Sequence, residues 1–143
     1  VTVLYRLAGE PAGSNESAFA DVAAGQWYTA AVAWAADKGI VNGYDAKIFG
    51  PLDSLTKEQI ITVLYRYQKM MGKDVTVANP KANYADMDPK ANYADMESVS
   101  KYAVQPILWA ADKGILRPDD RNNISPQSKV TRALLAVMVD AVR

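Results

Sequence analysis

Two basic side chains, Lys57 and Arg132, each follow a threonine at the expected start of a helix, 75 positions apart in the chain. An arginine guanidinium can hold a carboxylate through two parallel charge-assisted hydrogen bonds, whereas a lysine ammonium offers a point charge. The amino end of a helix adds partial positive charge that favours an anion. Such a helix start could hold an acidic group, and arginine would hold it more sharply than lysine. The alternative is a solvated basic side chain in each first helical turn.

Two aspartates, Asp21 and Asp95, stand in matching Phe-Ala-Asp and Tyr-Ala-Asp segments. Such a carboxylate can pin the turn that follows it or bind a sugar hydroxyl, and the sequence leaves both roles open. Paired carboxylates can also catalyse glycoside hydrolysis without histidine. Because these two acids are equivalent residues in two repeats, rather than an asymmetric acid and base, the sequence disfavours an enzyme.

Three further residues, Trp27, Gly43 and Tyr44, could shape a binding surface. Trp27 could stack on a pyranose ring, although a tryptophan that opens an amphipathic helix more often packs in a core. Gly43 and Tyr44 lie in an expected turn, where glycine allows a ligand to approach the backbone closely. Pro118 occupies the place of Gly43 in the second copy of the pattern, which weakens the case for an equivalent surface there.

The composition excludes several kinds of chemistry. The chain has 143 residues with no histidine and no cysteine, which excludes His-based nucleophile systems, His-ligated metals, thiolate zinc and disulfides. Lys and Arg number 16, as do Asp and Glu, so no overall field draws the chain to nucleic acid or an anionic membrane. No run approaches the ~20 apolar residues of a membrane span. Residues 119–123 lack the glycine and glutamate of an EF-hand-like loop, and we expect neither a metal site nor a cofactor.

A repeated heptapeptide organises the chain. Trp-Ala-Ala-Asp-Lys-Gly-Ile occurs at Trp34–Ile40 and again at Trp109–Ile115, and a period this long indicates related supersecondary units. In the first unit, apolar spacing predicts a short helix that ends at Gly39. A capping box formed by Thr56 and Gln59 predicts the start of a longer helix. The predicted buried stripe of this longer helix consists of Ile60, Val63, Leu64, Tyr67 and Met71.

The second unit repeats this plan less regularly. A short helix is expected to begin late, with Pro106 in its first turn, because proline is costly deeper in a helix. Thr131 is expected to open the last helix. Residues 79–96 read NPKANYADM followed by DPKANYADM, a tandem duplication. Its second copy, which contains Tyr93, is expected to fill the slot that Phe19 fills in the first unit, leaving the other copy as an exposed loop.

The pattern predicts three segments along the chain. Residues 1–13 contain VTVLYRL, which matches ITVLYRY later in the chain, and are expected to be the end of a first repeat whose beginning is missing. Residues 14–78 are expected to form the second repeat. Residues 79–143 are expected to form a third, divergent repeat that includes the duplicated loop.

The order of these elements resembles the S-layer homology domain. The segments FADV, WYTAAVAWAADKGIVNGY, IFGP and LTKEQIITVLYRY, within residues 19–67, carry the resemblance, and residues 93–139 match more loosely. The resemblance implies an all-α fold of helical repeats, with the longer helices packed as a pseudo-threefold bundle and joined by short turns. It also implies grooves between repeats that hold anionic polymers of the Gram-positive cell wall, often ending in a pyruvylated amino sugar.

In that family, the basic residue of a Thr-Arg-x-Glu motif meets the acidic group of the ligand. Here the motif corresponds to Thr56-Lys57-Glu58-Gln59 and to Thr131-Arg132-Ala133-Leu134. The resemblance therefore places Lys57 and Arg132 at the grooves. With the residues considered above, the expected glycan-binding set is Lys57, Arg132, Asp21, Asp95, Trp27, Gly43 and Tyr44.

The resulting prediction is a non-enzymatic module that anchors a larger protein outside the cell, on the wall or S-layer of a Gram-positive-type bacterium. Its expected partner is a pyruvylated secondary cell wall polysaccharide, with no nucleic acid and no membrane span. The alternative is a helical assembly module that has lost glycan binding and contacts other copies of the surface-layer protein. Lysine at position 57, and leucine at position 134 in place of an acid or amide, favour this alternative.

Overall fold

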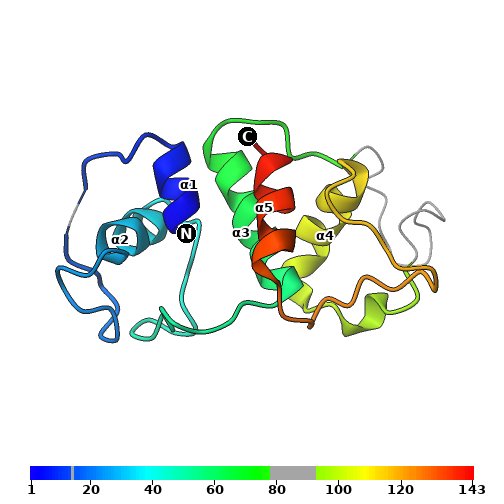
Figure 1. Cartoon of the computed structure of the whole chain (residues 1–143), viewed down its shortest axis with the longest axis horizontal. Helices are drawn as coiled ribbons and strands as arrows, with labels where there is room; N and C mark the ends of the chain where they lie inside the picture. Colours follow the sequence, from blue (N-terminus) through cyan, green and yellow to red (C-terminus); the bar gives the residue numbers. More distant parts are fainter. Residues whose placement is uncertain (14, 78–92) are drawn as a thin grey trace. The chain divides into compact units, whose positions relative to one another are not determined.

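The computed structural model describes residues 1–13, 15–77 and 93–143 (Figure 1). Its elements are the helices α1 (Thr2–Leu7), α2 (Thr29–Asp37), α3 (Lys57–Met70), α4 (Val104–Asp112) and α5 (Arg132–Asp140), with short 3-10 helices η2 (Met96–Ser98) and η3 (Lys101–Ala103). The described residues contain no strand. Their β-type backbone pairing is limited to one isolated antiparallel bridge, between Thr56 and Lys129. The all-α prediction is confirmed.

The described residues form two compact units, unit 1 (Val1–Asp53) and unit 2 (Ser54–Arg143). Unit 1 contains α1 and α2, and unit 2 contains the remaining helices. The boundary falls just before α3, so the longer helix of the predicted second repeat packs with α4 and η3 of the predicted third repeat. The three-segment division and the pseudo-threefold bundle stay predictions. The first copy of the nine-residue duplication lies outside the described residues.

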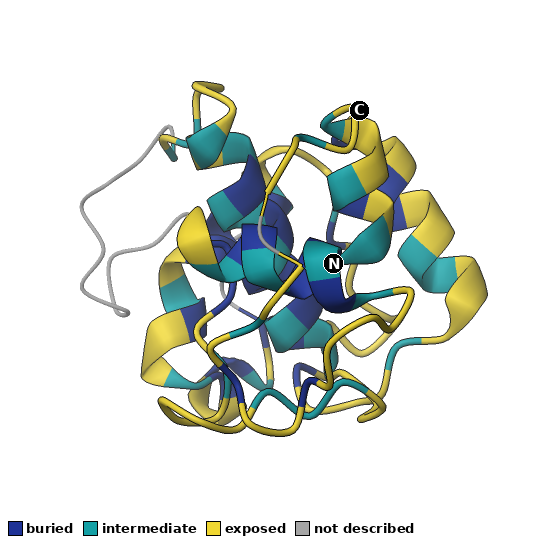
Figure 2. Cartoon of the chain, turned by 90° about the vertical axis from the view of Figure 1, so that its left-hand side faces the viewer, coloured by how far each residue is buried: buried dark blue, intermediate teal, exposed yellow. Residues whose placement is uncertain are grey.

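Unit 1 is held by apolar packing on both sides of α2. Phe19, Val22 and Val32 form one buried cluster. Tyr5 of α1 packs on Trp34 of α2, with ring centroids 5.5 Å apart. The helices carry buried and exposed positions on the same element (Figure 2), as amphipathic helices do.

The sequence predicted the carboxyl end of α2 correctly but not its amino end. Gly39 adopts a φ of 66° just after the helix, and its amide donates to Ala36 O at 3.0 Å, which confirms the predicted helix end. The start is later than the apolar spacing predicted, because α2 begins at Thr29. Trp27 therefore precedes the helix rather than lying on its inward face.

Helix α3 shows the predicted capping box, in which Thr56 and Gln59 exchange side-chain and backbone hydrogen bonds. Met71 was wrongly placed in the buried stripe: it follows the last helical residue and is 46% exposed. Ile61, which the stripe omitted, is fully buried, because α4 and η3 both pack on α3 and widen its covered face. The buried apolar residues of α3 are Ile60, Ile61, Leu64 and Tyr67.

The third-repeat elements follow the sequence closely. Pro106 lies in the first turn of α4, as predicted. Trp109 of the same helix is buried and meets the ring of Tyr65 edge-on, at 5.6 Å between centroids. Tyr93 is buried within unit 2, at the position equivalent to that of the buried Phe19 in unit 1.

Among the described residues, none of the helices has the length and apolar character needed to cross a membrane.

Candidate functional site

Asp21 closes a turn within unit 1. Its two carboxylate oxygens accept hydrogen bonds from the backbone amides of Phe49, at 2.9 Å, and Gly50, at 2.7 Å. The bond from Phe49, followed by that from Gly50, favours the ionised carboxylate and lowers the pKa of Asp21 below its ordinary value of 3.8. Of the two roles the sequence left open, the structure shows the pinning of a turn.

Asp95 makes the same arrangement in unit 2. It accepts hydrogen bonds from the amides of Ile124, at 2.8 Å, and Ser125, at 2.7 Å. Ser125 has a φ of 50°, and Gly50, at the matching position of unit 1, has a φ of 71°. The backbone thus turns in the same unusual way in both copies, and the aspartate clamp holds it there.

We expect unit 1 to lose stability in acid because of Asp21. A carboxyl whose pKa is lower in the folded than in the unfolded chain binds protons more readily after unfolding. Its contribution is therefore complete above the unfolded value of 3.8 and is lost as the pH falls through the folded value. Urea unfolding from about pH 6 down to pH 2 should show this slope, and Asp21→Asn should flatten it. An unchanged slope in that variant would show that other acids dominate.

Gly43 and Tyr44 lie in one turn of unit 1. Gly43 has a φ of 71°, and a Cβ at this position would lie 2.6 Å from both the backbone oxygen of Ile48 and the ring of Phe19. The turn therefore needs glycine for its own packing. Tyr44 is 57% exposed, and its backbone amide donates to Ile48 O at 2.7 Å. The structure thus gives Gly43 a role in the fold and leaves Tyr44 at the surface.

Trp27 is a surface residue. Its side chain is 75% exposed and meets Tyr28 edge-on, with ring centroids 5.3 Å apart. The core role that is commoner for such a tryptophan is wrong here, because the residue lies two positions before the start of α2. An exposed indole is free to take part in recognition by stacking.

Lys57 lies in the first turn of α3, where a loop of unit 2 covers it. Its ammonium donates to the backbone oxygen of Ile124. The backbone amides of Lys57 and Glu58 donate to Ser128 O, at 2.8 Å, and Pro126 O, at 3.0 Å. The positive end of α3 is thus directed at protein carbonyl groups in this structure.

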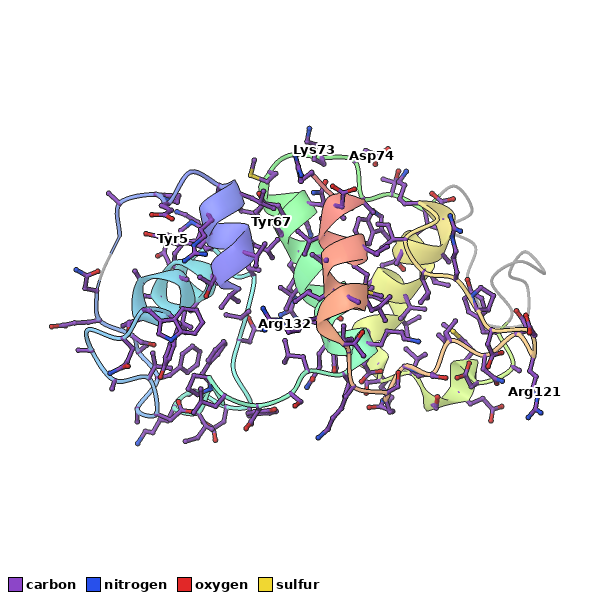
Figure 3. All side chains as sticks on the ribbon, viewed as in Figure 1. Tyr5, Tyr67, Lys73, Asp74, Arg121 and Arg132 are labelled. Atoms are coloured by element: carbon purple, nitrogen blue, oxygen red, sulfur yellow. The ribbon has the colours of Figure 1, made fainter. Side chains whose placement is uncertain are left out.

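Arg132 lies in the first turn of α5, which is open. Thr131 caps this helix by accepting the amide of Leu134 at 3.2 Å. Arg132 and Ala133 are exposed, and in the described part of the chain their amides donate no hydrogen bond. The guanidinium forms no ion pair with any residue that the structure describes. Figure 3 shows this side chain at the amino end of α5.

Glu58, which the sequence did not single out, joins α3 to the start of the α4 region. It is 2% exposed. Its carboxylate accepts hydrogen bonds from the Ser100 amide at 3.0 Å, the Ser100 hydroxyl at 2.7 Å and the Tyr102 hydroxyl at 3.0 Å. Burial alone would raise the pKa of this carboxyl, but the hydrogen bonds from Ser100, Gln127 and Tyr102 together outweigh it and hold the pKa below its ordinary value.

Tyr102 responds to the same contact. Burial, the hydrogen bond to Glu58 and the charge of Glu58 together raise the pKa of the Tyr102 phenol to about 12. An acid in a first helical turn is common on solvated helices, because it complements the helix dipole. The sequence pattern around Glu58 therefore gave no sign that this acid is buried.

A family model described as the S-layer homology domain matches residues 18–61 and again residues 92–133. The two matches begin just before Phe19 and Tyr93, and they end within α3 and α5. Together they cover more than half of the chain. A comparison with curated proteins gives no match.

Proposed function

The chain belongs to the S-layer homology domain family, and we propose that it binds a pyruvylated secondary cell wall polysaccharide at the first turn of α5. Domains of this family are repeat modules that associate with the cell wall through its polysaccharide, and they are binding modules rather than enzymes. The specific glycan, the Gram-positive wall and the S-layer setting are part of the proposal.

The observation that carries the proposal is the contrast between the two helix starts. The first turn of α3 is covered by carbonyl groups, whereas Arg132 and the first amides of α5 are exposed. A pyruvyl carboxylate at α5 can accept two parallel hydrogen bonds from the guanidinium. The exposed amides and the dipole of the nine-residue helix α5 favour the same negative charge.

The other expected site residues support the surface in different ways. Asp21, Asp95 and Gly43 hold turns in place, so we propose that they position the backbone rather than contact the sugar. Trp27 and Tyr44 are exposed aromatic residues, which can stack on pyranose rings. Lys57 adds a second, weaker contact, because an ammonium has three donors and one is directed at Ile124 O.

We expect Arg132→Ala to weaken polysaccharide binding about 10- to 100-fold, since hydrogen bonds to a charged group contribute about 1.5–3 kcal/mol. Lys57→Ala should weaken it by less than about threefold. Calorimetric titration with the polysaccharide, with and without its pyruvyl groups, measures both effects. Only the pyruvylated form should show the dependence on Arg132.

Arg121→Ala is the matched control, because Arg121 is another exposed arginine of unit 2. This variant should bind as the unmodified chain does. Equal loss in the Arg121 and Arg132 variants would point to unspecific attraction of charge. Absence of binding by a folded sample would contradict the proposal.

A second candidate function is assembly with other copies of the surface protein. Its specific support is the sequence of the α5 start, where Ala133 stands in place of the buried Glu58 of α3. The first turn of α5 thus lacks the acid that joins α3 to its neighbouring segment. It keeps the exposed amides that α3 uses to bind a loop.

A further inference from the structure

We propose that the loop of residues 49–53 in unit 1 of one copy docks on the first turn of α5 in a second copy of the chain. The inference deepens the assembly candidate. It uses the same helix start as the proposed glycan site, so polysaccharide and a second copy would compete for it. Unit 2 already contains an equivalent contact between a loop and a helix start, which we call the joint of unit 2.

That joint is made by residues 124–130 on the first turn of α3. Beyond the two carbonyl groups that accept the first amides of α3, the amide of Val130 donates to Leu55 O at 3.1 Å. An isolated antiparallel bridge pairs Thr56 with Lys129. Pro126 is fully buried in this joint. The loop therefore fits the helix start mainly through backbone groups, which depend little on side-chain identity.

The loop of unit 1 has the backbone conformation that such docking requires. The amide of Asp53 donates to Gly50 O at 3.1 Å, and the amide of Ser128 donates to Ser125 O at 3.0 Å. The Asp21 and Asp95 clamps hold the preceding residues of the two loops in the same way. Because these hydrogen bonds recur in both turns, the carbonyl groups of Pro51 and Asp53 correspond to those of Pro126 and Ser128, which accept the first amides of α3.

The start of α5 likewise matches the start of α3. Thr56 has φ −77° and ψ 163°, and Thr131 has φ −76° and ψ 158°. Each threonine side chain accepts the amide three residues on. The start of α5 is exposed, whereas the equivalent start of α3 in the same chain is occupied by the loop of residues 124–130.

The unit 1 loop and the start of α5, which would form the contact between copies, are both more exposed than the loop and the start of α3 in the joint of unit 2. Ala133 is exposed, whereas Glu58 is buried, and Pro51 is half-buried, whereas Pro126 is fully buried. Each copy thus offers one loop and one helix start. Two such different surfaces make a head-to-tail contact, which extends into rings or filaments.

Charge selects this pairing. In the joint of unit 2 the backbone amide of Lys57 donates to Ser128 O, while its ammonium donates to Ile124 O. The residues in register with Lys57 and Ser128 are Arg132 and Asp53, each 75 positions away. Docking would therefore set an arginine beside an aspartate of the other copy, and such complementarity favours the correct register. A loop of five residues makes a small interface, so we expect weak association, with a Kd on the order of 100 μM.

Reversal of the two charges tests the proposal by sedimentation velocity across a range of concentrations. Asp53→Arg and Arg132→Asp should each weaken self-association on the order of 100-fold, because like charges then face each other. The double variant Asp53→Arg/Arg132→Asp should recover it. A mixture of the two single variants should associate and extend as alternating copies, since the loop of each variant is compatible only with the helix start of the other. Arg121→Asp is the control and should associate normally.

Polysaccharide titration of the same variants separates this inference from the proposed function. Asp53→Arg should lose association and keep glycan binding, whereas Arg132→Asp should lose both. The double variant should recover association alone. A folded chain that stays monomeric up to about 1 mM would overturn the inference. Charge reversals that alter only the stability of a monomer would also overturn it, because the loop would then dock within one chain.

Discussion

Replacement of Glu58 by alanine should lower the free energy of unfolding of unit 2 by about 3 kcal/mol. The buried carboxylate accepts three hydrogen bonds from Ser100 and Tyr102. Its removal leaves the Ser100 amide and hydroxyl without their acceptor, and it opens a cavity at the start of α3. Urea unfolding followed by circular dichroism measures the loss, and amide hydrogen exchange in α3 and α4 assigns it to unit 2.

Glu58→Gln separates the loss of charge from the loss of packing. The amide keeps one acceptor oxygen, so this variant should lose only about half as much stability. The Tyr102 phenol provides an independent readout, because its pKa is raised to about 12 from an ordinary value of 10. In Glu58→Gln it should ionise closer to 10, as followed by ultraviolet absorption against Tyr102→Phe.

The sign of the alkaline effect follows from the same contact. A phenol that binds its proton more tightly in the folded chain stabilises it below the unfolded pKa of 10, and this contribution is lost as the pH rises through about 12. Identical unfolding of Glu58→Ala and the unmodified chain would show that the network is not coupled to the fold. An unshifted Tyr102 titration in Glu58→Gln would contradict the assigned hydrogen bond.

The elements that the sequence predicted well depend on contacts between near neighbours. The capping box of Thr56 and Gln59 spans three residues, Gly39 ends a helix by its own backbone conformation, and Pro106 restricts only the turn it occupies. In each case the residue type alone carries most of the physical reason.

The features that the sequence missed depend on residues far apart in the chain. Glu58 is joined to Ser100 and Tyr102 across 42 and 44 positions, and nothing local marks that pairing. Ile61 is buried because a second element covers the flank of α3. The choice between sugar binding and turn pinning for Asp21 also required the position of Phe49, 28 residues away.

In the candidate site, too, the sequence predicted the residue types, whereas their accessibility depends on segments far away in the chain. Resemblance to the family selected Lys57 and Arg132 as equivalent residues, and the sequence favoured arginine on chemical grounds alone. Only the structure shows that the first turn of α3 is covered by a loop whereas that of α5 is exposed. Equivalent positions in a repeat can thus differ in accessibility, because each depends on what the neighbouring segment provides.

Gly43→Ala should destabilise unit 1 by about 3 kcal/mol. Part of this cost is conformational, since a residue with a Cβ pays about 1–2 kcal/mol in the left-handed region that Gly43 occupies at φ 71°. The rest is steric, because the new Cβ would lie 2.6 Å from a backbone oxygen and from the ring of Phe19. Neither neighbour can move freely, as one belongs to the main chain and the other to the buried cluster.

Gly39→Ala is the matched control, because Gly39 has a similar φ of 66° but no atom within 4 Å of the added Cβ. It should cost only the conformational share, about 1–2 kcal/mol. Urea unfolding of the two variants therefore isolates the packing of the Gly43 turn. If both unfold at the same urea concentration and Gly43→Ala alone binds polysaccharide poorly, then Gly43 serves ligand approach and the structural role is wrong. A larger loss of stability in Gly43→Ala, with binding reduced only as unfolding requires, would establish it as a residue of the fold.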